Sequence, residues 1–129
     1  MTSPDRPLEG IKVVELSHMV LGPSCGLILA DLGADVVKVE PAPGGDKTRQ
    51  LPGSGSGYFG AFNRNKRSVA VDLKSAEGHK FAMKLVSKSD ILIENFGTGV
   101  LDRLGLGYDA MKKINPSLVY CALKGFLSG

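Results

Sequence analysis

Residues 21–40, LGPSCGLILADLGADVVKVE, determine the fold that this sequence predicts. Pro23 suits the first turn of a helix, because its fixed φ is already helical and its missing N–H has no partner there. Gly33 stands where a helix commonly ends, and residues 35–39 have the composition of a strand. The helix between them is apolar on nearly every face, so we expect it to be covered on more than one side.

The rest of the sequence alternates predicted strands with predicted helices. Further strands are expected at residues 11–16, 68–73, 90–94 and 118–123, and further helices at residues 75–87, 100–104 and 108–114. This alternation predicts an α/β fold with a parallel sheet and right-handed crossovers. Residues 41–57 are rich in Gly, Ser and Pro and show no periodicity, which predicts a mobile loop.

Composition places the chain among soluble globular proteins. Its 129 residues are enough for one domain with a modest core. The hydrophobic content of 43% and charged content of 22% are ordinary, and a net charge of +3 does not by itself indicate nucleic acid. The polar N-terminus and short apolar runs predict neither a signal peptide nor a membrane span. We therefore expect a cytoplasmic protein without nucleic-acid or membrane partners.

The residues typical of several common active sites are absent or badly spaced. A dinucleotide site needs G-x-G-x-x-G after the first strand, but only Gly22 and Gly26 occur there, and Glu40 alone is weak support. His18 lacks partners at triad-like spacing, so a structural role is favoured. Cys25 and Cys121 form neither disulfide nor metal-site spacing, which predicts reduced, buried thiols and no metal site.

Cations and one amide recur near the ends of the predicted strands. They are Arg49, Arg64, Lys66, Arg67, Lys74, Asn95, Arg103 and Lys124. Dispersed cations of this kind suit a long ligand that carries several phosphates, although any single one is equally typical of an ordinary surface. Residues alone leave these two interpretations open.

Six stretches in order carry a family resemblance. They are residues 7–17, 22–41, 44–49, 62–78, 90–109 and 114–126, the second reading GPSCGLILADLGADVVKVEP. Together they resemble the family III CoA-transferases, or CaiB/BaiF family, which includes formyl-CoA transferase, carnitine CoA-transferase and α-methylacyl-CoA racemase.

The resemblance implies a Rossmann-like large domain, with a mostly parallel sheet and helices on both faces. It also implies a smaller second domain and homodimers whose two chains are interlinked like rings. Residues 1–129 would be the N-terminal part of the large domain of a longer enzyme, with the second domain and the catalytic segment outside this sequence.

The resemblance also assigns a coenzyme A site. The residues that it implies for CoA binding are Val71, Leu73, Lys74, Asn95, Phe96, Val100, Arg103 and Lys124. Val20 and Leu21 would line the pocket for the thioester. There formyl-CoA transferase has a glutamine and an alanine, and an apolar Val20 cannot hydrogen-bond a small polar acyl group. Specificity for formate or oxalate is therefore not expected.

The function implied is transfer of CoA from an acyl-CoA thioester to a carboxylic acid through an enzyme-aspartyl intermediate. The nucleophilic aspartate of the family lies downstream of the stretch that resembles residues 124–126, so we expect no catalytic residue in this segment and an inactive isolated chain. CoA would be a substrate and no cofactor would be bound permanently. The alternatives are an acyl-CoA racemase of the same family and an inactive CoA-binding fragment.

Overall fold

A five-stranded sheet forms the centre of the computed structural model, which describes residues 5–126. The strands are β1 (Lys12–Leu16), β2 (Asp35–Pro41), β3 (Arg67–Val71), β4 (Ile91–Glu94) and β5 (Val119–Ala122). Their spatial order is β3-β2-β1-β4-β5, and every neighbouring pair is parallel. The chain thus starts in the middle of the sheet and winds outward in both directions, which confirms the predicted α/β, Rossmann-like class.

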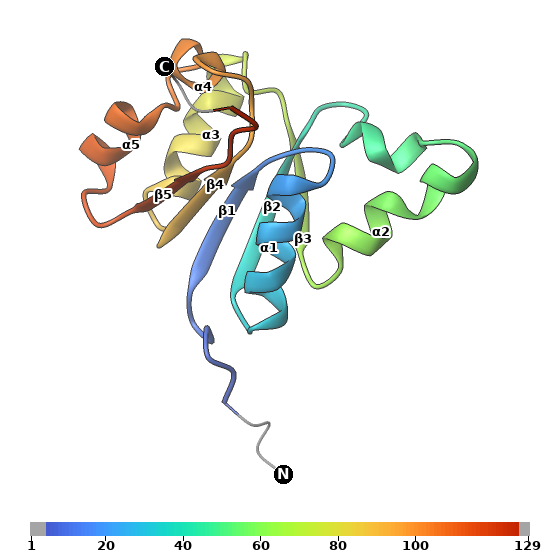
Figure 1. The fold of residues 1–129 in the computed structure, drawn as a ribbon. Helices are drawn as coiled ribbons and strands as arrows, with labels where there is room; N and C mark the ends of the chain where they lie inside the picture. The colour runs from blue at the N-terminus through green and yellow to red at the C-terminus, as the bar shows by residue number, and fades with distance from the viewer. Residues whose placement is uncertain (1–4, 127–129) are drawn as a thin grey trace.

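Helices cover both faces of this sheet, as predicted (Figure 1). They are α1 (Leu21–Asp31), α2 (Tyr58–Asn63), α3 (Ala76–Val86), α4 (Val100–Arg103) and α5 (Tyr108–Ile114). On one face α1 contributes Ala30 to a core with Val13 and Val36. On the other face α3 contributes Ala82 and Val86 to a larger core that also holds residues following β4. Each face therefore has its own apolar cluster.

Local signals set most of the element boundaries. The Ser75 hydroxyl accepts a hydrogen bond from the Gly78 N–H at 3.0 Å and begins α3, as its N-cap position predicts. Gly33 has a φ of +106°, which is the left-handed conformation that ends α1. The first helix begins at Leu21, two residues before the predicted Pro23, because the loop after β1 already turns helically at Val20.

Residues 41–57 contain more regular structure than the sequence indicated. They hold two 3₁₀ helices, η1 (Lys47–Gln50) and η2 (Gly53–Gly57), and α2 follows directly where no helix was predicted. Asp46 and Thr48 are buried, and the Asp46 carboxylate caps η1 by accepting from the Thr48 N–H at 2.9 Å. Burial of polar side chains such as these produces no hydrophobic periodicity in the sequence, so the sequence pattern could not predict the helices of this segment.

Helix α1 is covered on two sides and open on a third. It packs on β1 and β2 and against α2, which agrees with the prediction that more than one side is covered. Its remaining side exposes Leu21, Ile28 and Leu32, with Ile28 60% exposed. Within residues 5–126 no helix is long and apolar enough to cross a membrane.

Candidate functional site

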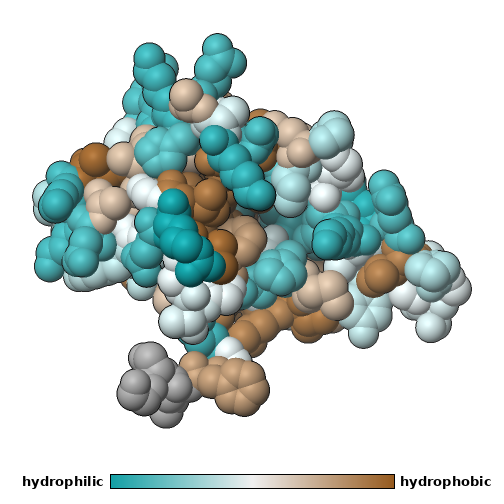
Figure 2. All heavy atoms as spheres, turned by 90° about the horizontal axis from the view of Figure 1, so that it is seen from above, coloured by the Kyte–Doolittle hydropathy of each residue, from teal (hydrophilic) through white to brown (hydrophobic). Residues whose placement is uncertain are grey.

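Three hollows that share lining residues follow one another along the carboxyl edge of the sheet, and together they are called the groove below. The first, of about 870 Å³, lies between α3 and α4 and is lined by Lys74, Arg103 and Leu104. The second, of about 270 Å³, shares Lys74 and Leu104 with the first and adds Phe96. The third, of about 240 Å³, shares Phe96 with the second and ends at His18 in the loop after β1. Seen from above, hydrophobic side chains fill the middle of this end of the molecule among hydrophilic ones (Figure 2).

The groove crosses the point where the order of the strands reverses. β1 and β4 are neighbours in the sheet, but the chain continues from β1 to β2 on one side and from β4 to β5 on the other. His18 follows β1 and Phe96 follows β4, and their rings lie 5.6 Å apart between centroids. In open α/β sheets, ligands bind in the crevice at such a switch point.

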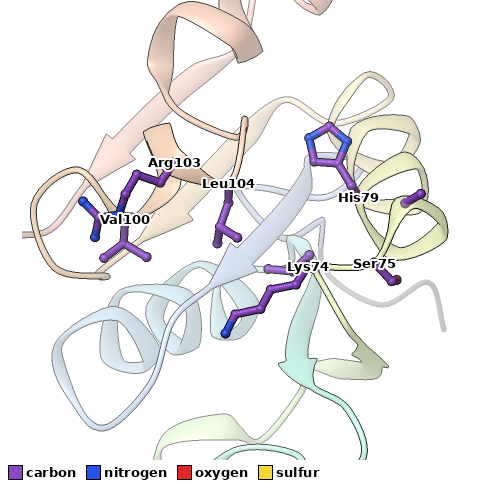
Figure 3. Close-up of a pocket in the computed structure, with 8 residues that line it drawn as sticks. Lys74, Ser75, His79, Val100, Arg103 and Leu104 are labelled. Atoms are coloured by element: carbon purple, nitrogen blue, oxygen red, sulfur yellow. The ribbon is translucent and has the colours of Figure 1, made fainter.

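The wide end of the groove presents two cations from different elements. Lys74 follows β3, Arg103 ends α4, and Leu104 lies between them (Figure 3). The left-handed Gly99, with a φ of +74°, lets the chain turn tightly before α4, and a Cβ there would lie 3.1 Å from the Arg103 Nη1. A flat guanidinium and a flexible ammonium at one opening can together hold phosphate groups.

Most of the predicted cation ring is engaged in ion pairs. The pairs are Arg49–Glu40, Arg64–Asp31, Lys66–Glu15, Arg67–Asp35 and Lys124–Glu94. Each of these five cations therefore has a carboxylate partner within the protein, and their role as phosphate ligands stays a prediction. In the described part of the chain, Lys74 and Arg103 are the two cations of that set without an ion pair.

Glu40, at the end of β2, is fully occupied by its own neighbours. Its carboxylate accepts hydrogen bonds from Arg49 Nε at 2.7 Å, Arg49 Nη2 at 2.8 Å, Ser68 Oγ at 2.6 Å and the Asp46 N–H at 2.7 Å. Burial alone would raise the pKa of Glu40, but these donors outweigh it and lower the pKa to about 2. Glu40 thus fixes the segment after β2 and has no free oxygen for a ribose.

A buried charge network lies beneath the narrow end of the groove. The Lys38 Nζ lies 3.1 Å from Glu15 Oε1 and 3.1 Å from Asp46 Oδ2, and it donates to the Ser17 carbonyl at 2.9 Å. Lys66 Nζ lies 2.7 Å from Glu15 Oε2. Two carboxylates therefore face two ammoniums, and their charges balance.

Hydrogen-bond geometry within this network is incomplete. Glu15 Oε2 and Asp46 Oδ2 accept no hydrogen bond of regular geometry, so the nearby ammoniums satisfy them mainly by charge. Burial lowers the pKa of Lys66, although the Glu15 carboxylate opposes that shift. Burial pushes the pKa of Asp46 upward, but hydrogen bonds from Thr48 and the charge of Lys38 leave it lowered. The network ties β1, β2, η1 and the turn before β3 to one another.

The structure places the predicted CoA-binding residues in two groups. Val71, Leu73, Lys74, Phe96, Val100 and Arg103 line the groove. Asn95 and Lys124 instead bond to the protein itself. The Asn95 amide accepts from the His18 N–H at 3.0 Å and donates to the His18 carbonyl at 2.8 Å. Lys124 donates to Glu94 and to the Phe96 carbonyl. Both therefore hold the walls of the groove, and their direct contact with a ligand stays a prediction.

The two predicted thioester residues do not line the narrow pocket. Val20 is half-buried beside α1, and Leu21 is 52% exposed. His18 and Met19, earlier in the same loop, line the pocket together with Lys47. Sequence reasoning gave none of these three a ligand contact. The loop turns at Met19, which has a positive φ of 63°. The local sequence does not predict this turn, because Met is not a residue that favours positive φ.

Neither cysteine lines the groove. Cys25 and Cys121 are free and half-buried, so the predicted reduced state agrees with the structure but full burial does not. Burial and the neighbouring Cys121 raise the pKa of the Cys25 thiol, which favours its protonated form. Among residues 5–126 no cluster of His, Cys, Asp or Glu is arranged to hold a metal ion.

The fold is a doubly wound α/β domain, with a groove along the carboxyl edge of its sheet that has Lys74 and Arg103 at one end. The model of CoA-transferase family III matches residues 8–129, and the chain therefore belongs to that family.

Relatives and a solved structure agree with this family. The chain is 47% identical over 128 residues to a formyl-CoA:oxalate CoA-transferase of Streptomyces coelicolor, covering 96% of the chain and 31% of the relative. It is 42% identical over 130 residues to a succinate–glutarate CoA-transferase of Agrobacterium fabrum, covering 93% of the chain and 32% of the relative.

A crystal structure of a CaiB/BaiF family protein from Brucella suis superposes with a TM-score of 0.88 at 46% identity, over 95% of this chain and 34% of that one. The chain thus spans about a third of the length of the relatives that it matches.

Proposed function

We propose that the chain forms the CoA-binding part of an enzyme that moves CoA from an acyl-CoA thioester to a carboxylic acid. The observation that carries this proposal is the groove with Lys74 and Arg103 at its wide end and apolar walls along its length. CoA has the same distribution of properties, with phosphates at the nucleotide end and a thioester at the far end of a long arm. Its diphosphate and 3′-phosphate would lie at Lys74 and Arg103.

The chemistry proposed is covalent and conserves every atom. An aspartate carboxylate attacks the donor thioester carbonyl, the C–S bond breaks, and an acyl-aspartyl anhydride and the CoA thiolate result. The thiolate attacks the aspartyl carbonyl and releases the donor acid, leaving an aspartyl-CoA thioester. The acceptor carboxylate then repeats these two steps in reverse order, which forms the new acyl-CoA and regenerates the aspartate. The aspartate would lie outside residues 1–129.

This chain would contribute positioning. The CoA thiolate is free between the two steps, so the phosphates must stay anchored while the thiolate attacks the next carbonyl. Lys74 and Arg103 would provide that anchor, and Phe96 would guide the pantetheine arm toward the narrow pocket. The complete enzyme is proposed to be a cytoplasmic, interlinked homodimer, as the family resemblance implies.

A trapping experiment tests the mechanism in the complete polypeptide. Incubation with an acyl-CoA and a carboxylic acid should yield the new acyl-CoA, and hydroxylamine should intercept a CoA thioester on the protein. A racemase would instead exchange the proton next to the thioester carbonyl in D₂O, so such exchange without transfer would contradict the proposal. The isolated 129-residue chain should bind CoA without transferring it, and turnover there would show that the nucleophile lies inside it.

A further inference from the structure

One buried lysine joins the two loops that form walls of the narrow pocket. Lys38 lies in β2 and is 1% exposed. Its ammonium donates a hydrogen bond to the Ser17 carbonyl at 2.9 Å and lies 3.1 Å from Asp46 Oδ2. Ser17 belongs to the loop after β1 and Asp46 to the loop after β2, and both residues line the narrow pocket. Lys38 therefore fixes the distance between two sides of this cavity.

The other polar supports of these loops each act on one loop. Asn95 holds the first loop through the N–H and the carbonyl of His18. Glu40 holds the second loop by accepting a hydrogen bond from the Asp46 N–H at 2.7 Å. Among the hydrogen bonds and ion pairs in the described part of the chain, Lys38 is the side chain that reaches both loops. Without its ammonium, each loop stays attached to the sheet, but the two are no longer tied to each other.

Stability alone does not account for a charge at this position. Strand pairing sets Lys38 beside Glu15, whose Oε1 lies 3.1 Å from the ammonium. Burying such charges is costly, and well-packed apolar residues in place of a buried ion pair are often neutral or stabilising. An ammonium with three N–H donors instead holds oxygen atoms at hydrogen-bond distance, which fixes the groups that carry them relative to one another. The geometry of Lys38 thus favours a role in positioning.

We propose that Lys38 is a positioning residue for CoA transfer, which keeps the narrow pocket in the shape that aligns the thioester with the attacking carboxylate. This inference rests on the proposed function, in which the thioester end of CoA reaches that pocket. Lys38 acts through Ser17 and Asp46 and does not itself contact the substrate, since its ammonium is engaged by protein oxygens. A displacement of about 1 Å between reacting groups can lower a rate about 100-fold.

The phosphate end of the groove should be insensitive to this residue. Lys74 and Arg103 line the wide hollow, which shares no lining residue with the narrow pocket. Loss of Lys38 should therefore lower kcat while the affinity for CoA, which its phosphates would anchor at the wide end, changes little. A general loss of structure would instead weaken both.

Steady-state kinetics and calorimetry on the complete polypeptide test this inference. The double variant Lys38→Met with Asp46→Asn removes the bridge without leaving an unpaired buried carboxylate. It should lower kcat at least about 10-fold, with the Kd for CoA within about 2-fold of that of the unmodified protein. Asp46→Asn alone weakens the tie to the second loop only, and takes the place of the double variant if that does not fold. Val86→Ala, a buried change in α3, also lowers stability but should leave kcat within about 2-fold.

Each remaining outcome overturns a stated part of the account. An unchanged kcat in the folded double variant, or in Asp46→Asn where the double variant does not fold, would refute the positioning role. So would an equal fall of kcat in Val86→Ala, or a Kd for CoA that rises as much as kcat falls, because either would show a general loss of structure. Absence of CoA binding or of CoA transfer in the unmodified protein would refute the proposed function instead. The two failures are therefore distinguishable in one set of measurements.

Discussion

Replacement of Lys38 by methionine should strongly destabilise the protein. Met keeps much of the length of the apolar stem but removes the ammonium that contacts Glu15, Asp46 and the Ser17 carbonyl. Glu15 retains Lys66 at 2.7 Å, whereas no other cation in residues 5–126 pairs with Asp46. Removing one member of a buried ion pair costs about 3–5 kcal/mol, because the other charge stays buried without compensation. We expect a loss of that size in the free energy of unfolding at pH 7.

The pH dependence of the loss identifies its cause. In the variant, the unpaired Asp46 carboxyl should bind its proton more tightly when folded than when unfolded, so its folded pKa lies above the unfolded value. Stability then increases as the pH falls from 7 toward 5, and the deficit relative to the unmodified protein shrinks. A double variant, Lys38→Met with Asp46→Asn, should recover part of the lost free energy of unfolding, because it also removes the unpaired buried carboxylate.

Urea unfolding at pH 7 and at pH 5 measures these differences. Lys84→Met, at an exposed lysine of α3, is the matched control and should change the free energy of unfolding by less than about 0.5 kcal/mol. A Lys38→Met deficit below about 1 kcal/mol, or one that does not change with pH, would refute the assignment of a charge-balanced network.

Two further predictions concern the parts of the fold that shape the groove. Glu40→Gln should lower stability at neutral pH by about 3 kcal/mol, the scale of its pKa shift. Because the folded pKa of Glu40 is lowered to about 2, the unmodified protein should lose this part of its stability as the pH falls from about 4.5. The variant has no carboxyl at this position and should lose less stability over the same range. Identical acid unfolding curves for the two proteins would contradict this prediction. Gly26→Ala would place a Cβ against the Glu15 carboxylate and 3.2 Å from Lys66 Nζ, and should cost about 1–3 kcal/mol in thermal or urea unfolding. Gly60→Ala in α2, where a Cβ meets nothing within 4 Å, should be neutral or slightly stabilising, and an equal loss in both variants would argue against the close approach of α1 to Glu15.

The fold followed from sequence because its signals are local. The apolar runs of the strands, the Ser75 cap and the left-handed Gly33 each depend on a few neighbouring residues, and they give the alternation that specifies a parallel α/β sheet. The sequence predicts β3 at residues 68–73, and the strand is observed at Arg67–Val71, a shift of the kind expected where a strand runs into a loop.

The functional role of each cation could not be predicted in the same way. Arg67 and Arg103 are both basic residues near the end of an element, but Arg67 pairs with Asp35 across the sheet at 2.6 Å and Arg103 forms no ion pair in the described chain. The partner of Arg67 is 32 residues away in the sequence. Only the tertiary structure shows which charges are balanced, and hence which remain for a ligand.

The same limit applies to the narrow pocket. Lys47 lies in the stretch GGDKTR, which contributed to the family resemblance, but its place in the groove depends on Asp46 being buried against Lys38. Val20 and Leu21 follow His18 and Met19 in the same loop, but only the latter two line the narrow pocket, and Met19 has a left-handed backbone conformation. The role of Val20 and Leu21 at the thioester stays a prediction.

Calorimetric titration with CoA tests most directly the central claim, that ion pairing leaves Lys74 and Arg103 to hold the ligand. Arg103→Gln should weaken CoA binding by about 1–3 kcal/mol, the scale of a charged hydrogen bond, and Lys74→Gln should act in the same direction. Arg67→Gln, which removes a cation already paired with Asp35, should leave the affinity unchanged. Unchanged affinity in Arg103→Gln, or an equal loss in Arg67→Gln, would contradict the account.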